Sequence, residues 1–166
     1  MAVRISLLAT LSAALLPCTA VAQDDAAAVA SANRQYLALV ERGPDQGWQA
    51  TPGGVHWRRV KGDGSGTRPA VDGMVTAHYE GKLVDGTIFD SSYARGEPII
   101  FPVSKVIPGW QQLLPLMGVG DTVEAAIPFQ LAYGPKGKGP IPPGATLLFK
   151  IELLSTGQDS DAGDKK

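Results

Sequence analysis

Glycine and proline break this chain into short segments. The sequence holds 20 glycines and 13 prolines in 166 residues, about one residue in five, against an average of about 12%. This density stays below the roughly 25–30% that is typical of low-complexity disorder, so we expect a folded chain that is rich in turns. Hydrophobic residues make up 44% of the sequence, which is enough for one core, and the length fits one domain with appendages.

Charge and the rarest residue types exclude several classes of function. With 15 basic and 16 acidic residues the net charge is −1, which argues against a protein that binds the nucleic-acid backbone. One cysteine cannot form an internal disulfide, and one cysteine with two histidines cannot build a zinc site of these residue types. We therefore expect no metal and no cofactor. A catalytic triad would have to use His56 or His78.

The first 22 residues have the three parts of an export signal. A positive charge near the start is followed by an apolar run over residues 5–16, and the small residues Ala20 and Ala22 mark a cleavage site before Gln23. A run of 12 residues is too short to cross a bilayer, which needs about 20, so a membrane anchor is the weaker alternative. Lipidation of Cys18 is a second alternative. We expect a protein secreted across the inner membrane into the periplasm.

Residues 23–50 are predicted to form a helical extension and a linker. An acidic pair precedes a stretch of good helix formers, which predicts a helix over residues 26–42 that ends at Gly43 and Pro44. Only a narrow apolar stripe, which includes Tyr36, runs along this helix. We therefore expect the helix to pack weakly or on a partner chain, as in a monomer or a weak dimer.

Residues 51–156 are predicted to form one α+β domain, an antiparallel sheet with a short helix on one face, followed by a disordered polar tail at 157–166. Apolar patterns between turn signals predict the strands. The predicted strands are residues 55–60, 74–80, 88–90, 99–101, 122–127 and 146–154. The last of them is almost continuously apolar, so we expect it to lie in the centre of the sheet.

The predicted helix of this domain has Pro108 in its first turn, a position where proline is well tolerated. Trp110, Leu113 and Met117 recur at the spacing of one helix face, which predicts that this face is buried. Pro115 lacks the N–H that should reach back one turn, so we expect it to shorten or kink the helix.

Some short motifs resemble ligand-binding or catalytic sites, but the residues around them do not support these functions. The glycines at 62–66 resemble a phosphate-binding loop, but no helix follows them. Ser91 and Ser92 could supply a nucleophile only with a base nearby, and no residue close in the sequence provides one. His78 is expected on the solvated face of its strand.

Aromatic residues stand out instead. They lie in or beside the predicted strands, the start of the helix and the long loop at 128–145, and are Tyr79, Phe89, Phe101, Trp110, Tyr133 and Phe149. Buried tyrosine hydroxyls need hydrogen-bond partners, and so does Asp90, which directly follows an apolar residue. An apolar pocket with a few polar groups is typical of a ligand site.

Five strings of residues carry a resemblance to a known family. They are VTAHYEG at 75–81, LVDGTIFDSS at 83–92, VIPGW at 106–110, LAYG at 131–134 and IPPGATLLFKIELL at 141–154. Over residues 53–154 the chain resembles the FKBP-type peptidyl-prolyl cis-trans isomerases. The resemblance implies a bent antiparallel β-sheet wrapped around one short α-helix, here preceded by an N-terminal helix. It also implies an enzyme that accelerates isomerisation of Xaa-Pro bonds in exported proteins.

The resemblance implies a role for each site residue. The residues implied in catalysis are Asp90, Tyr133, Trp110, Phe89 and Tyr79, and those implied in substrate binding are Phe101, Val106, Ile107, Ile141, Phe149 and Arg95. Trp110 is implied as the floor of the pocket, Tyr133 and the Ile107 N–H as donors to the ligand, and Arg95 as the partner that orients Asp90.

The implied partners are unfolded or partly folded proline-containing polypeptides and rapamycin-type macrolide inhibitors. A folding chaperone or peptide-binding module of the same fold, with little turnover, is the alternative. The loop at 134–142 departs from the best-known eukaryotic members: it is shorter and carries Lys136 and Lys138. This departure leaves the rim contacts and the substrate preference open.

Overall fold

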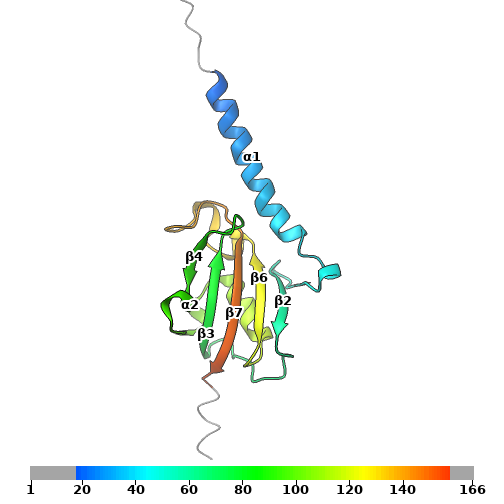
Figure 1. Ribbon diagram of the computed structural model, residues 1–166, viewed down its shortest axis with the longest axis vertical. Helices are drawn as coiled ribbons and strands as arrows, with labels where there is room; N and C mark the ends of the chain where they lie inside the picture. The colour runs from blue at the N-terminus through cyan, green and yellow to red at the C-terminus, as the bar shows by residue number, and fades with distance from the viewer. Residues whose placement is uncertain (1–17, 158–166) are drawn as a thin grey trace, which may run out of the picture.

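The computed structural model describes residues 18–157, with side chains from residue 24 onward. Within these residues a seven-stranded antiparallel sheet forms the main body (Figure 1). Its strands are β1 (Gln49–Ala50), β2 (His56–Lys61), β3 (Met74–Lys82), β4 (Ile88–Ser91), β5 (Ile99–Pro102), β6 (Thr122–Ile127) and β7 (Leu147–Thr156). The α-helices are α1 (Cys18–Val40), α2 (Ser92–Arg95) and α3 (Pro108–Leu113). The α+β class is confirmed, and the six predicted strands are correct to within two residues at their ends. Strand β1 was not predicted: it lies in the segment expected to be a linker and pairs with β2.

The strands follow one another in the order β1-β2-β6-β7-β3-β4, and β5 also pairs with β3. Strand β7 lies between β6 and β3, with Phe149 opposite Ala125 and Glu152 opposite His78. This confirms the predicted central position of the last strand. Side chains alternate along β7, so that Ile151 is fully buried while Glu152 is not.

Helix α3 contributes the buried face that its sequence spacing predicts. Trp110 is 4% exposed and Leu113 is fully buried; Met117 is also fully buried, but it follows the helix in extended backbone. The α-helix ends at Leu113, and Pro115 lies in a 3-10 turn over Leu114–Leu116. The proline therefore shortens the α-helix, because its ring nitrogen carries no N–H for a bond to the preceding turn.

Helix α1 begins at Cys18, eight residues before the predicted start, so the acidic pair that includes Asp24 lies inside it. Its C-terminal half is fixed to the domain through Gln35. The Thr146 N–H donates to Gln35 Oε1 at 2.7 Å, and the Thr146 hydroxyl donates to the Gln35 carbonyl at 3.2 Å. The N-terminal half projects away from the sheet (Figure 1).

Two predicted segments lie largely outside the residues that the structure describes. Of the predicted export signal at 1–22, only residues 18–22 are described, and they belong to α1. Of the predicted tail at 157–166, only Gly157 is described. None of the helices within residues 18–157 has the length and apolar character of a membrane-spanning helix.

Candidate functional site

Aromatic side chains from β3, β4, β5 and β7 gather at the start of α3. The ring centroid of Trp110 lies 5.4 Å from that of Tyr79 and 5.3 Å from that of Phe149, both edge to face. Phe101 lies 5.5 Å from Trp110, and Phe89 meets Phe149 at 5.7 Å. Edge-to-face packing is favourable because the positive ring edge meets the negative ring face. The structure thus brings these five predicted residues into one aromatic cluster.

The other predicted wall and rim residues pack against the same core. Val106 and Ile107 are partly buried, and Ile141 is 7% exposed. The indole Nε1 of Trp110 is buried and has no hydrogen-bond partner in the described structure. An unpaired buried donor costs about 1–3 kcal/mol, and such groups in native proteins call for an explanation. Here the orphaned donor belongs to the residue at the centre of the cluster.

A carboxylate, a phenol and a guanidinium form the polar end of this cluster. The Tyr79 hydroxyl donates to Asp90 Oδ2, and Arg95 Nη1 pairs with Asp90 Oδ1. Arg95 Nη2 also donates to the Tyr79 hydroxyl oxygen at 3.1 Å, and the guanidinium lies over the Tyr79 ring, 5.6 Å from its centroid. Each member of the trio therefore contacts both others.

These contacts fix the charge states of the trio. Burial acts to raise the pKa of Asp90, but the hydrogen bonds from Tyr79 and Arg95 outweigh it and hold this pKa below its usual value. Burial and then the bond to Asp90 raise the pKa of Tyr79. At neutral pH Asp90 is therefore a charged acceptor and Tyr79 a protonated donor.

Tyr133 lies next to the trio, in the long loop between β6 and β7. Burial, followed by the negative charge of Asp90, raises the pKa of its hydroxyl. No hydrogen-bond partner for this hydroxyl lies within the described part of the chain. Tyr133 thus keeps its proton and has it available for a ligand.

The expectation that no base lies near Ser91 and Ser92 is wrong for Ser92. His78 Nδ1 is 2.9 Å from Ser92 Oγ. However, Ser92 is fully buried, and its hydroxyl accepts from the Tyr79 N–H at 2.7 Å and donates to the Tyr79 carbonyl at 3.1 Å. A substrate cannot reach this oxygen, so Ser92 is no nucleophile. Instead it joins β3 to α2, the helix that carries Arg95.

We expect Ser92→Ala to lower the free energy of unfolding by about 1–3 kcal/mol, because the buried N–H of Tyr79 loses its acceptor. Urea unfolding followed by fluorescence measures this change. Ser65→Ala is the control: its side chain is exposed, and we expect a change within about 0.5 kcal/mol. Equal stability of the two variants would contradict the role given to Ser92.

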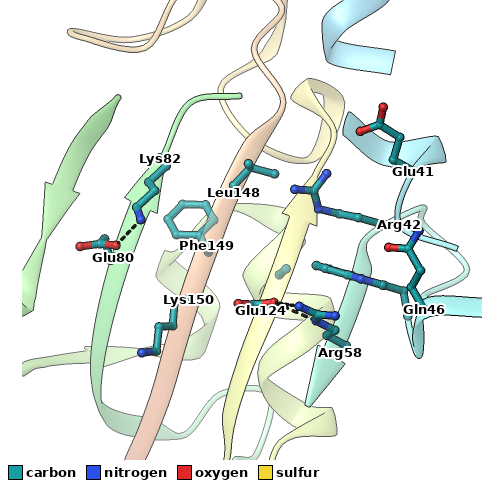
Figure 2. A pocket seen from close by; sticks show the side chains of 12 residues that line it. Glu41, Arg42, Gln46, Arg58, Glu80, Lys82, Glu124, Leu148, Phe149 and Lys150 are labelled. Atoms are coloured by element: carbon teal, nitrogen blue, oxygen red, sulfur yellow. Dashed lines mark hydrogen bonds and ion pairs between the residues drawn. The ribbon is translucent and has the colours of Figure 1, made fainter. Parts of the chain in front are cut away.

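A hollow lies on the outer face of the sheet (Figure 2). This groove of about 460 Å³ runs between the end of α1 and outward side chains of β2, β3, β6 and β7. Arg58 on β2 pairs with Glu124 on the neighbouring strand β6, and Lys82 pairs with Glu80 on the same strand, both at 2.8 Å. Because these charges neutralise one another, the aromatic cluster is the better candidate for the functional site.

Known proteins are similar to this chain in sequence and in fold. The family described as FKBP-type peptidyl-prolyl cis-trans isomerase matches residues 66–154. The FKBP-type 22 kDa peptidyl-prolyl cis-trans isomerase of Escherichia coli is 50% identical over 117 residues, which is 70% of this chain and 56% of the relative. The FKBP-type isomerase FkpA of Aeromonas hydrophila is 40% identical over 143 residues, 86% of this chain and 52% of the relative. The chain spans about half the length of these curated relatives.

Solved structures agree. FkpA from Escherichia coli has a TM-score of 0.74 at 34% identity, over 81% of this chain and 63% of that one. A peptidyl-prolyl cis-trans isomerase from Pseudomonas syringae pv. tomato has a TM-score of 0.70 at 31% identity, over 76% of this chain and 93% of that one. Since the family match covers more than half of the sequence, the chain belongs to the FKBP-type peptidyl-prolyl cis-trans isomerases.

Proposed function

We propose that this protein accelerates the cis–trans isomerisation of Xaa-Pro peptide bonds. The observation that carries the proposal is the aromatic cluster around Trp110 with its polar trio at one end. An apolar aromatic site with a few oriented polar groups suits a proline ring and the peptide bond that precedes it.

This reaction needs rotation and no bond breaking. The barrier to peptide rotation is about 18–20 kcal/mol because rotation removes amide resonance, and Xaa-Pro bonds exchange over tens to hundreds of seconds. The planar amide carries charge separation that an apolar pocket stabilises less well than water does. The twisted amide is less polarised, so its binding is favoured over that of the planar form.

In the proposed site the proline ring packs on Trp110. The Tyr133 hydroxyl donates to the substrate carbonyl, and the Ile107 N–H is a second donor. Asp90, held ionised by Tyr79 and Arg95, is the remaining polar group. The apolar walls and rim are Phe89, Phe101, Val106, Phe149 and Ile141. The same pocket is proposed to bind rapamycin-type macrolides.

An isomerisation assay with a Leu-Pro peptide tests the proposal. Relaxation from cis to trans that is faster than the uncatalysed rate, in proportion to protein concentration, supports it. No acceleration by a folded protein would sink it and would favour the alternative, a chaperone or peptide-binding module with little turnover.

Tyr133→Phe is expected to lower kcat/KM in this assay roughly two- to tenfold, the effect of one hydrogen bond worth about 0.5–1.5 kcal/mol. The melting temperature should not change, because the Tyr133 hydroxyl bonds to no described residue. Tyr36→Phe is the control, since Tyr36 lies on α1 and is 65% exposed. Equal activity of the two variants would remove Tyr133 from the site.

Helix α1 supports two further proposals about partners. Val29, Leu37 and Val40 are 60%, 47% and 53% exposed, and exposed apolar surface of this kind commonly marks an interaction site. We propose that this helix contacts unfolded client chains or a second copy of itself in a weak dimer. Sedimentation of the chain with and without residues 23–50 tests the dimer; a full chain that sediments at its own monomer mass, as the shortened chain is expected to do, would exclude it.

We propose that the clients are exported proteins in the periplasm. The export-signal pattern at 1–22 supports this. A relative from Legionella longbeachae, 47% identical over 105 residues, 63% of this chain and 45% of the relative, carries the name outer membrane protein MIP. Release of the full-length gene product by osmotic shock is expected, and recovery with the cytoplasmic fraction would contradict it.

A further inference from the structure

The rim loop beside Tyr133 holds a lysine in a defined place. The Lys138 N–H donates to the Ile141 carbonyl at 2.9 Å, and the Ile141 N–H donates back to the Lys138 carbonyl at 3.0 Å. Gly137 permits this turn: its φ is +70°, and a Cβ there would lie 2.2 Å from the Ile141 carbonyl oxygen. Because Ile141 is 7% exposed and packs into the core, the backbone of Lys138 is anchored to the domain.

The side chain of Lys138 points its charge at the proposed site. Its Nζ lies 5.7 Å from the centroid of the Tyr133 ring, a distance at which a cation is attracted to the ring face. Of the ion pairs between described residues, none includes Lys138 or the nearby exposed Lys136. The charge of Asp90 is already matched by Arg95. This side of the rim therefore carries uncompensated positive charge.

We infer that Lys138 gives the site a preference for substrates with an acidic side chain next to the proline. The inference rests on the proposed isomerase function, because it places a substrate carbonyl at the Tyr133 hydroxyl. A residue adjacent to that carbonyl then lies near the Lys138 ammonium. A partly exposed ion pair contributes about 0.2–1 kcal/mol, which corresponds to roughly a 1.4- to fivefold gain in kcat/KM.

Salt is expected to weaken this preference. Exposed charges are screened over about 10 Å at 0.1 M salt and about 3 Å at 1 M. The gain should therefore shrink toward one at high salt. A preference that came from the shape of the pocket, with no contribution from charge, would not respond in this way.

Matched peptides test the inference. We compare kcat/KM for a Glu-Pro peptide with kcat/KM for a Gln-Pro peptide. A second pair of peptides carries Glu or Gln directly after the proline. A Leu-Pro peptide is the neutral reference. For the full chain we expect a Glu/Gln ratio of roughly 1.4 to five at one of the two positions, and a ratio near one in Lys138→Gln.

Lys61→Gln is the control, because it removes the same charge from a side chain that is 69% exposed on β2. It should keep the ratio of the unmodified protein. A ratio near one in the unmodified protein, or a ratio that Lys138→Gln does not lower, would overturn the inference. Acceleration of the Leu-Pro peptide in those cases leaves the isomerase proposal standing, whereas its absence removes both.

Discussion

Trp110→Ala should lower kcat/KM for a Leu-Pro peptide about tenfold or more. If the indole covers about 60 Å² of the proline ring, burial at about 25 cal/mol per Å² contributes about 1.5 kcal/mol, or roughly tenfold in rate. The loss should exceed this value, because the indole also packs edge to face against the rings of Tyr79 and Phe149. The peptide isomerisation assay measures the change.

Removal of a buried indole also costs stability, about 3–5 kcal/mol for Trp→Ala in a core. Trp57→Ala separates the two effects, because Trp57 is 5% exposed against 4% for Trp110. The ring of Trp57 lies under the Arg59 guanidinium on β2, away from the aromatic cluster. We expect comparable destabilisation of both variants, with activity lost in Trp110→Ala alone. Similar activity of the two folded variants would show that Trp110 is not the floor of the site.

Local patterns in the sequence predicted the elements that build this site. The spacing of Trp110, Leu113 and Met117 predicts one buried helix face, and all three are buried, although Met117 lies beyond the end of α3. The almost continuously apolar run in β7 similarly predicted a central strand, which its position between β6 and β3 confirms. Both features depend on residues close together in the chain, where periodicity is informative.

The contact between His78 and Ser92 was missed because it depends on strand register. The alternation in β3 placed His78 on the outer face, and nothing in that pattern showed what lies beside it. The turn at Asp85 and Gly86 does not fix this register by counting, because Lys82 pairs with Ile88 and a shift between Gly81 and Lys82 then pairs Glu80 with Ser91. A bulge of this kind leaves no mark on the alternation of residues.

The start of α1 was missed for a different reason. An acidic pair that includes Asp24 was expected to begin the helix, because carboxylates favour helix N-termini. Residues from Cys18 onward are themselves compatible with a helix, and α1 includes them. Charge near a helix end is worth only about 0.3–1 kcal/mol, too little to fix a boundary where alanines, the best helix formers, lie on both sides.

The glycine-rich segment at 62–66 resembles a phosphate-binding loop, but one of its backbone N–H groups already donates a hydrogen bond to a protein carboxylate. Asp121 is 2% exposed and accepts from the N–H groups of Gly64 at 3.0 Å and Gly118 at 2.8 Å. Its third partner is Arg59 Nε at 2.9 Å, and Arg59 Nη2 also donates to the Leu116 carbonyl at 3.2 Å. One buried carboxylate therefore fastens this loop to the turn that follows α3.

Asp121→Ala is expected to lower the free energy of unfolding by about 3–5 kcal/mol, because it leaves a partly buried guanidinium without its carboxylate. For a domain of about 100 residues each kcal/mol shifts the melting temperature by about 4–8 °C, so we expect a fall of more than about 10 °C. Asp63→Ala is the control: this exposed carboxylate accepts from the Ser65 N–H at 2.9 Å, and its loss should cost no more than about 1 kcal/mol. Thermal unfolding by circular dichroism measures both variants. Equal shifts would mean that Asp121 contributes no more than a surface turn, and that the segment at 62–66 is held by something other than this carboxylate.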